Sequence, residues 1–210
     1  MAHAKNGDAA DRLDAASEVL TDMMQASDKG IPQDLLNKAQ CVIIVPNLKK
    51  AGFVIGAKYG RGFAMCRKAG AGWSAPAGIR IEGGSFGLQI GASEQDVLLL
   101  VMNNGMKRLL ADKFTLGTEA SAAAGPVGRE ATAQTDLQLN AEMLSYSRSR
   151  GLFAGLSLQG ATMRPDADAN KEMYGKEMPN KDILTGDLAP PAAAGKLESL
   201  LNKNSSRRTR

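Results

Sequence analysis

Apolar residues alternate with small or polar ones along several short stretches of the chain. In residues 152–158 every even position is apolar, whereas the odd positions are mostly small or polar. This period of two predicts a strand with one side toward the core. The same alternation, with glycines on one side, recurs in "SFGLQIGA" (85–92) and "GFVIGAKYG" (52–60). Glycine in a strand indicates a bend, a bulge or a close backbone neighbour, so we expect a helix or another strand layer against the glycine side. The alternative is a bound ligand on that side.

A second period, near 3.6 residues, predicts the helices. An apolar stripe in 13–24 predicts an amphipathic first helix with acids on its polar side, and Pro32 predicts a second, short helix ending at Lys38. Further helices are expected at 104–112, 165–174 and 192–201. Strands are expected at 41–45, 52–59, 62–68, 72–75, 79–82, 86–92, 97–102, 114–124, 141–149 and 152–161. These elements predict an α+β fold, in which a curved, barrel-like antiparallel sheet is flanked by helices.

The length of 210 residues fits one domain. We expect a polar lead-in at 1–10, the domain at 11–186, and a C-terminal helix with a basic tail at 187–210. The densest apolar run holds six residues, far fewer than the roughly 20 that span a membrane. The pattern of a signal peptide is not visible in this sequence.

The net charge of +4 is unevenly distributed along the chain. Residues 41–108 carry nine basic residues against three acids, whereas the flanking segments 1–40 and 109–195 are acidic. Such segregation permits a basic face that attracts anionic or phosphorylated lipid head groups. The alternative is that these side chains point in different directions and pair with nearby acids. The candidate lipid-binding residues are Lys49, Lys50, Lys58, Arg61, Arg67, Lys68, Arg148 and Arg150.

Other chemistry finds less support in the sequence. Cys41 and Cys66 have no CxxC spacing, so we expect two buried free thiols rather than a metal or redox pair. The segment 166–177 places acids as in a calcium-binding EF-hand loop, but Lys171 stands where the loop needs glycine. A helix that begins just after Pro165 explains the same acids without a metal, and we favour it.

Enzymatic and nucleic-acid functions are also disfavoured. His3 is the single histidine, so no Ser-His-Asp or Cys-His arrangement can be assembled. The glycines of "GAKYGRG" lack the context of a nucleotide-binding loop. Trp73 and the few other aromatic residues do not interleave with the basic ones as a base-stacking surface requires. We therefore expect no catalysis, no cofactor, no metal and no specific nucleic-acid partner.

Four segments in order along residues 10–186 closely resemble the SYLF-domain family: "IPQDLLNKAQCVIIVPNLKKAGFVIGAKYGRG", "FTLGTEASAAAGPVGREA", "SYSRSRGLFAGLSLQGA" and "NKEMYGKEMPNKDILTG". The family occurs in bacterial secreted or envelope proteins and in eukaryotic phosphoinositide-binding and actin-associated proteins. The resemblance implies lipid binding at a membrane surface and, for a bacterial member, a periplasmic or secreted location. The alternative function is that the domain self-associates or binds a protein partner, as in the actin-bundling members from fungi.

Overall fold

The computed structural model describes most of the chain, with gaps. The described residues are 8–26, 30–52, 55–70, 72–86, 91–102, 105–127, 140–149, 152–155 and 158–205. The helices are α1 (Asp8–Gln25), α2 (Gln33–Lys38), α3 (Met106–Leu109), α5 (Ala167–Tyr174), α6 (Asn180–Thr185), the 3-10 helix η2 (Ala192–Ala194) and α7 (Gly195–Asn204). The strands are β1 (Cys41–Gly52), β2 (Ile55–Cys66), β3 (Ala77–Phe86), β4 (Gly91–Val101), β5 (Phe114–Thr115), β6 (Ala122–Ala124), β7 (Met143–Ser149), β8 (Leu152–Gly155) and β9 (Thr162–Pro165).

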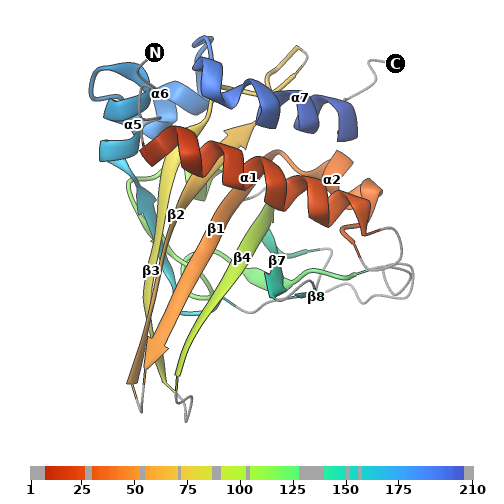
Figure 1. Cartoon of the computed structure of the whole chain (residues 1–210), viewed down its shortest axis with the longest axis vertical. Coiled ribbons are helices and arrows are strands. Elements are labelled where there is room, and N and C mark those ends of the chain that lie inside the picture. The colour runs from red at the N-terminus through yellow and green to blue at the C-terminus, as the bar shows by residue number, and fades with distance from the viewer. Residues whose placement is uncertain are drawn as a thin grey trace, which may run out of the picture.

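These strands form one curled sheet (Figure 1). Its order is β5-β9-β3-β2-β1-β4-β7-β6, and β8 also pairs with β7. The pairings between described strands are antiparallel, except that β6 runs parallel to β7. The predicted α+β fold with a curved antiparallel sheet is therefore confirmed, with one parallel pair added.

The central strands have two buried faces, each with its own core. Val42 and Ile44 of β1 point to the face that α1, α2 and α7 cover, which we call the outer face. Ile43 and Val45 point to the opposite, inner face, where α6 and the curled ends of the sheet close over them. Since strand side chains alternate, a strand buried on both sides needs the continuous apolar run that residues 41–45 supply.

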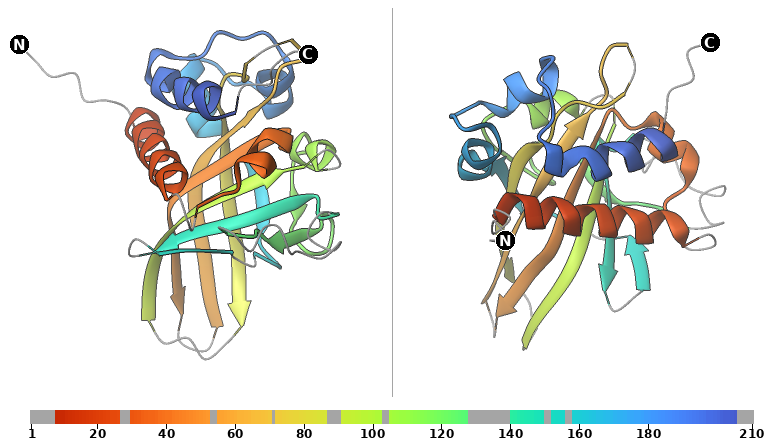
Figure 2. Two further views of the ribbon diagram at one scale, coloured as in Figure 1. Left: turned by 90° about the vertical axis from the view of Figure 1, so that its right-hand side faces the viewer. Right: turned by 45° about the horizontal axis from the view of Figure 1, so that its top comes forward.

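Helices α1 and α7 lie side by side over the outer face (Figures 1 and 2). Leu13 and Leu20 of α1 and Leu197 and Leu201 of α7 are buried in the same apolar cluster. The C-terminal helix therefore packs against the sheet, although the sequence placed it after the domain. The described residues contain no helix that is both long and apolar enough to span a bilayer.

Several predicted elements have different bounds in the structure. The strands expected at 52–59 and 62–68 are one strand, β2, and β3 continues through the glycine pair at 83–84. The strand expected at 114–124 is two short strands, and the helix expected at 104–112 is a single turn. Residues 72–75 form only an isolated bridge, because the Ser74 side chain, rather than a neighbouring strand, accepts the hydrogen bond from the Cys66 backbone N–H. Residues 53–54, 87–90 and 156–157 of the expected strands lie outside the described residues.

The close approach of β1 explains why β2 has glycines on one side. A Cβ on Gly62 would overlap the carbonyl oxygen of Ile44 and lie 2.7 Å from the Cα of Val45. A Cβ on Gly60 would lie 2.6 Å from the Cδ1 of Leu48. Strand β1 is irregular between Ile44 and Lys49, and this irregular segment packs onto the glycines. The close neighbour of these glycines is therefore an irregular segment of the adjacent strand in the same sheet, and not the helix or separate strand layer that the sequence predicted.

The prediction of two free thiols is wrong, because Cys41 and Cys66 form a disulfide. They are direct partners in the β1–β2 register, with Cα atoms 4.0 Å apart. The sequence separation of 25 residues gives no sign of this proximity. Only the long β1–β2 hairpin brings the two residues together.

Beyond the helices, the four central strands continue as a two-hairpin projection (Figure 1). We call it the β1–β4 extension and define it as residues 49–52, 55–59, 82–86 and 91–95. Its outer face continues the face that α1 covers higher up, and its inner face continues the row of Val45 and Leu48.

Candidate binding surfaces

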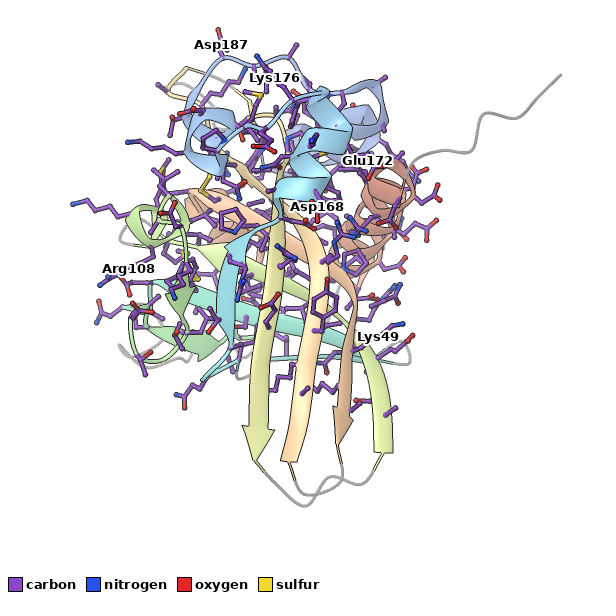
Figure 3. The ribbon with its side chains drawn as sticks, turned by 90° about the vertical axis from the view of Figure 1, so that its left-hand side faces the viewer. Lys49, Arg108, Asp168, Glu172, Lys176 and Asp187 are labelled. Carbon is purple, nitrogen blue, oxygen red and sulfur yellow. A yellow bond between two sulfur atoms is a disulfide. The ribbon has the colours of Figure 1, made fainter. Side chains whose placement is uncertain are left out.

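The structure distributes the predicted lipid-binding cations over several places. Lys49, Arg61 and Arg148 lie on the outer face, Lys50 and Lys58 on the inner face, and Arg67 and Lys68 beyond the other end of β2, away from the extension. Figure 3 shows this separation, with Lys49 on the extension and Asp187, the ion-pair partner of Lys68, at the opposite end. Arg150 lies outside the described residues. The seven described cations therefore do not share one face.

Arg61 joins three elements on the outer face. Its guanidinium donates to the buried carboxylate of Asp166 and to Asp8, the latter at 3.0 Å. The hydrogen bond to Asp166 is the main reason why the pKa of Arg61 is raised. Asp166 also caps α5 by accepting from the N–H of Ala169 at 3.4 Å. Arg61 thus ties the start of α1 and the start of α5 to the sheet.

Arg148 has a similar position on β7. Its Nε donates to Asp96 of β4 at 2.8 Å, and its Nη1 contacts Asp22 of α1. Asp96 also accepts from the backbone N–H of Asn47 at 3.0 Å. Arg148 therefore links α1 to the sheet, with two carboxylates already bound.

Arg67 binds the ends of two helices. Its guanidinium donates to the carbonyl oxygen of Ala39 at 2.8 Å and to that of Ser205 at 2.7 Å, and it reaches the carbonyl of Leu36 at 3.1 Å. It also lies 4.4 Å from the centre of the Trp73 ring. A cation at the C-terminal ends of α2 and α7 satisfies carbonyl groups that the helices leave without partners.

The two exposed pairs are simpler. Lys68 donates to Asp187 at 2.9 Å, which lowers the pKa of that carboxyl. Lys49 lies 3.7 Å from Glu94, and both side chains are mostly exposed. Exposed ion pairs of this kind are screened by solvent and contribute little to stability.

Lys50 and Lys58 differ from the other cations. They are direct partners across β1 and β2, and both are half-buried. Burial first, and then the charge of Lys58, lowers the pKa of Lys50. Among the described residues, no carboxylate forms an ion pair with either lysine.

The outer face of the β1–β4 extension carries an exposed aromatic side chain. Tyr59 is 44% exposed and stands in a row across the strands between Glu82 and Lys49. The next row toward the hairpin tips contains only exposed small residues. We call the two rows together the Tyr59 face, and its residues are Lys49, Ala51, Ala57, Tyr59, Glu82, Gly84, Ala92 and Glu94.

A pocket of about 480 Å³ adjoins the Tyr59 face. It lies between the first turns of α1 and the strands β1 and β2, and Arg12, Lys49, Tyr59 and Arg61 are among its lining residues. Its lining holds three cations and two acids, and one of the acids, Asp8, binds both arginines. The remaining cation, Lys49, pairs with Glu94 outside the lining, so each cation of this pocket already has an acidic partner.

The family model Ysc84, described as "Las17-binding protein actin regulator", matches residues 82–204. The chain is 34% identical over 177 residues to the SH3 domain-containing YSC84-like protein 1 of Rattus norvegicus, covering 83% of this chain and 52% of that protein. This chain belongs to the Ysc84 (SYLF) family. The predicted family is therefore confirmed.

Other members of the Ysc84 family have similar levels of identity. The LAS seventeen-binding protein 3 of Saccharomyces cerevisiae is 33% identical over 190 residues, which cover 89% of this chain and 41% of that protein. An SH3 domain-containing protein of Schizosaccharomyces pombe is 36% identical over 176 residues, covering 82% and 41% respectively. The chain spans about half the length of these relatives or less. No solved structure matches the chain.

In this Ysc84-family chain, helix α5 occupies residues 167–174 of the acidic segment 166–177, as favoured over the calcium loop. Asp166 caps α5 and binds Arg61, and the amide of Asn170 donates to the carbonyl of Met178 at 3.0 Å. The side chains of Asp166 and Asn170, two of the ligand positions of such a loop, are thus bound to other groups of the protein. Within the described residues, no group of three or more metal-binding side chains gathers.

Tyr59 is a candidate binding residue that the sequence pattern does not single out. The alternation in 52–60 puts Tyr59 on the bulky side of its strand, which is the side expected to face the core. That side is buried higher up the sheet, whereas Tyr59 is 44% exposed. A signal was present in the neighbouring alanine and glycine residues, which are too small to form a core by themselves.

Proposed function

We propose that this chain is a non-catalytic protein-binding domain and that its Tyr59 face contacts the partner. The observation that carries the proposal is an exposed tyrosine on a sheet face, beside a row of exposed small residues. Tyrosine contributes large contact area at low cost in conformational entropy and is frequent among residues that dominate interface energies.

The geometry around Tyr59 suits a broad protein surface better than a small ligand. The exposed residues of the next row, which include Ala51, Ala57 and Ala92, let a partner backbone approach the sheet closely. Lys49 and Glu94 provide exposed charges at the rim, where such charges set orientation and association rate more than affinity.

The relatives support a protein partner. One is named a LAS seventeen-binding protein, and the family model is described as an actin regulator. We extend protein binding to this chain on these names and on the Tyr59 face, and we take actin filaments as the first partner to test.

The test is co-sedimentation of the purified chain with actin filaments. We expect wild type to pellet and the variant Ala57→Arg to stay in the supernatant, because an arginine in the small-residue row blocks close approach. Ala193→Arg is the matched control, since it makes the same substitution at an exposed position of η2, outside the Tyr59 face. Failure of wild type to pellet, or equal pelleting of wild type and Ala57→Arg, contradicts the proposal.

Binding of anionic lipid through the eight predicted cations stays a prediction. Arg61, Arg67 and Arg148 have internal partners, so charge reversal at those positions would test folding as much as binding. A fair test reverses Lys49, Lys50 and Lys58 and measures sedimentation with anionic liposomes. Unchanged sedimentation would exclude these three lysines from lipid binding.

We also propose that the chain works in an oxidising compartment, as the periplasmic or secreted location implies. The Cys41–Cys66 disulfide supports this location, since such bonds persist in secreted and periplasmic proteins and are rare in reducing ones. The test is alkylation of protein from its native source, followed by mass measurement. Two alkylated cysteines would contradict the proposal, and none would support it.

A further inference from the structure

Strand β4 has a neighbouring strand on only one side within the β1–β4 extension. Higher up, residues 96–101 lie between β1 and β7, whereas residues 92–95 pair with β1 and with no other described strand. Strand β7 ends at this level because Ser149 pairs with Leu152 of β8, so the chain turns back there. Figure 2 shows β4 continuing past β7 into the extension. We call residues 92–95 the β4 edge.

The backbone groups of Ala92 and Glu94 point away from β1, toward the open side of the β4 edge. The N–H of Met102 donates to the carbonyl oxygen of Glu142 at 2.8 Å, immediately after Val101 pairs with β7. In an antiparallel ladder such a bond flanks a non-hydrogen-bonded pair, so the backbone groups of Val101 face β1. This direction alternates along a regular strand, and the extra residue at the irregular part of the β1–β4 pairing belongs to β1 rather than to β4. Ala92 and Glu94 therefore offer N–H and C=O groups to a further strand.

The β4 edge lacks the features that protect most exposed strand edges. Such edges usually carry lysine, proline or a bulge. The sequence of 92–95 is "ASEQ", which contains neither residue type, and residues 92–94 are exposed. The opposite edge of the extension is less open, because a Cβ on Gly83 of β3 would lie 3.0 Å from the Cα of Ala161. The β4 edge is therefore the better place for an added strand.

The side chains of the β4 edge indicate which partner segment fits it. Glu94 is exposed on the outer face and has Lys49 on its β1 side at 3.7 Å, with no described strand on its other side. A basic side chain directly opposite Glu94 on an added strand forms a favourable cross-strand pair. Ala92 ends the small-residue row on the same face and leaves room for an apolar side chain opposite it.

We propose that the β4 edge binds an extended segment of a partner protein as an added antiparallel strand. The segment carries a basic residue opposite Glu94 and, two positions later, an apolar residue opposite Ala92. In this mode of recognition, backbone hydrogen bonds supply affinity and alternate side chains supply specificity. A second copy of this chain fits less well, since its β4 edge contains no basic residue to place opposite Glu94. Ala92 and Glu94 belong to the Tyr59 face, so this strand addition rests on the proposed function and specifies the partner.

The experiment titrates the whole chain into a labelled threonine-rich peptide that carries lysine and, two positions later, valine, and measures fluorescence anisotropy. Threonine favours extended backbone, and we expect saturable binding. N-methylation at the lysine removes the N–H that donates to the carbonyl oxygen of Glu94 and should weaken binding by about tenfold. N-methylation at the residue between lysine and valine is the matched control. The N–H of that residue faces away from the β4 edge, so its loss should leave Kd unchanged.

Variants of the chain test the same contacts from the other side. Ala92→Pro removes an N–H that faces the open side, where proline is tolerated in a strand, and should weaken peptide binding by about tenfold. Ala92→Ser keeps the N–H and is the matched control. Glu94→Lys should weaken binding of the lysine peptide by about threefold and strengthen, by a similar factor, binding of a peptide with glutamate in place of lysine. This exchange of preference is measurable even if Ala92→Pro fails to fold.

Absence of saturable peptide binding by wild type overturns the proposal, as does equal weakening by the two N-methylated peptides. A wild-type dimer that Ala92→Pro separates in sedimentation equilibrium, without peptide binding, overturns it in favour of a second copy. Because the peptide assay contains no actin, it is independent of the co-sedimentation test. Pelleting with actin but no peptide binding leaves the proposed function standing and removes the β4 edge from it. Peptide binding without pelleting supports strand addition with a partner other than actin.

Discussion

Replacing Arg67 with glutamine tests whether this cation serves folding, as the structure indicates, or binding, as the sequence suggested. Arg67 connects the sheet to the ends of α2 and α7 through the carbonyl groups of Ala39 and Ser205. Its guanidinium also stacks on Trp73. Glutamine keeps much of the polarity but loses the charge and the forked donor geometry.

The expected loss of folding stability in Arg67→Gln follows from these contacts. Two short hydrogen bonds from a charged donor, at 2.7 and 2.8 Å, contribute about 1.5 kcal/mol each, and the contact with Trp73 adds about 1 kcal/mol. Arg67→Gln should therefore lower the free energy of unfolding by about 4 kcal/mol. For a chain of this length, that corresponds to a fall in Tm of about 8–16 °C.

The assay is thermal unfolding followed by circular dichroism, together with limited trypsin digestion at low temperature. Because Arg67 holds the end of α7, the variant should be cut sooner at Lys196 and Lys203 of that helix. Lys68→Gln is the matched control, since its partner Asp187 is fully exposed, and we expect it to unfold within about 2 °C of wild type.

The reasoning is refuted if Arg67→Gln and Lys68→Gln have the same midpoint and the same digestion pattern. Arg67 would then be dispensable for folding and available to a ligand. Reduced ligand binding by a fully stable Arg67→Gln protein would restore the interpretation drawn from the sequence.

Three further predictions concern the disulfide, a glycine and a lysine. Reduction of the Cys41–Cys66 bond, with its sequence separation of 25 residues, should lower the free energy of unfolding by about 3.5 kcal/mol, measured by denaturant titration with and without dithiothreitol; no effect of the reductant would contradict this value. Gly62→Ala should lower the free energy of unfolding by about 3 kcal/mol or more, because the new Cβ overlaps the backbone of β1. Gly70→Ala, which has open space around it, should leave the free energy of unfolding unchanged in the same titration. Equal values for the two variants would show that β1 moves to accommodate the Cβ. The folded state holds the pKa of Lys50 below 10.5, so the unfolded chain binds more protons between that lowered pKa and 10.5. Wild-type stability should therefore rise relative to Lys50→Gln as the pH increases through this window, and a constant difference between the two titrations would count against the burial of Lys50.

The alternating patterns in the sequence predicted where most strands run, because alternation reflects burial on one face and is a local property. The predicted bounds are wrong where glycine does not end a strand. At residues 83–84 the chain continues in β3, since both glycines have partners on β2 that complete the hydrogen-bonded ladder. At 104–112 the apolar residues suggested a full helix, but they pack a single turn against the inner core.

The candidate site shows the limit of sequence reasoning more clearly. Lys49 and Lys50 are neighbours in the sequence and lie on opposite faces, one paired with Glu94 and the other opposite Lys58. The count of basic residues was correct, but the partners of those residues were not visible. Asp166 is 105 residues away from Arg61 in sequence, and the two meet only because α5 packs on β3, the strand next to β2.

By itself, the sequence determined the fold class, the amphipathic first helix, the glycine-lined strands and the family, because these depend on residue type and local spacing. Tertiary structure decided the Cys41–Cys66 pairing, the internal partners of the arginines, the exposure of Tyr59 and the isolation of Lys50 with Lys58. All four depend on the register between strands and on how far the helices extend over the sheet. The strand register and the extent to which helices cover the sheet are set by packing between distant segments, so a local pattern of residues does not predict them.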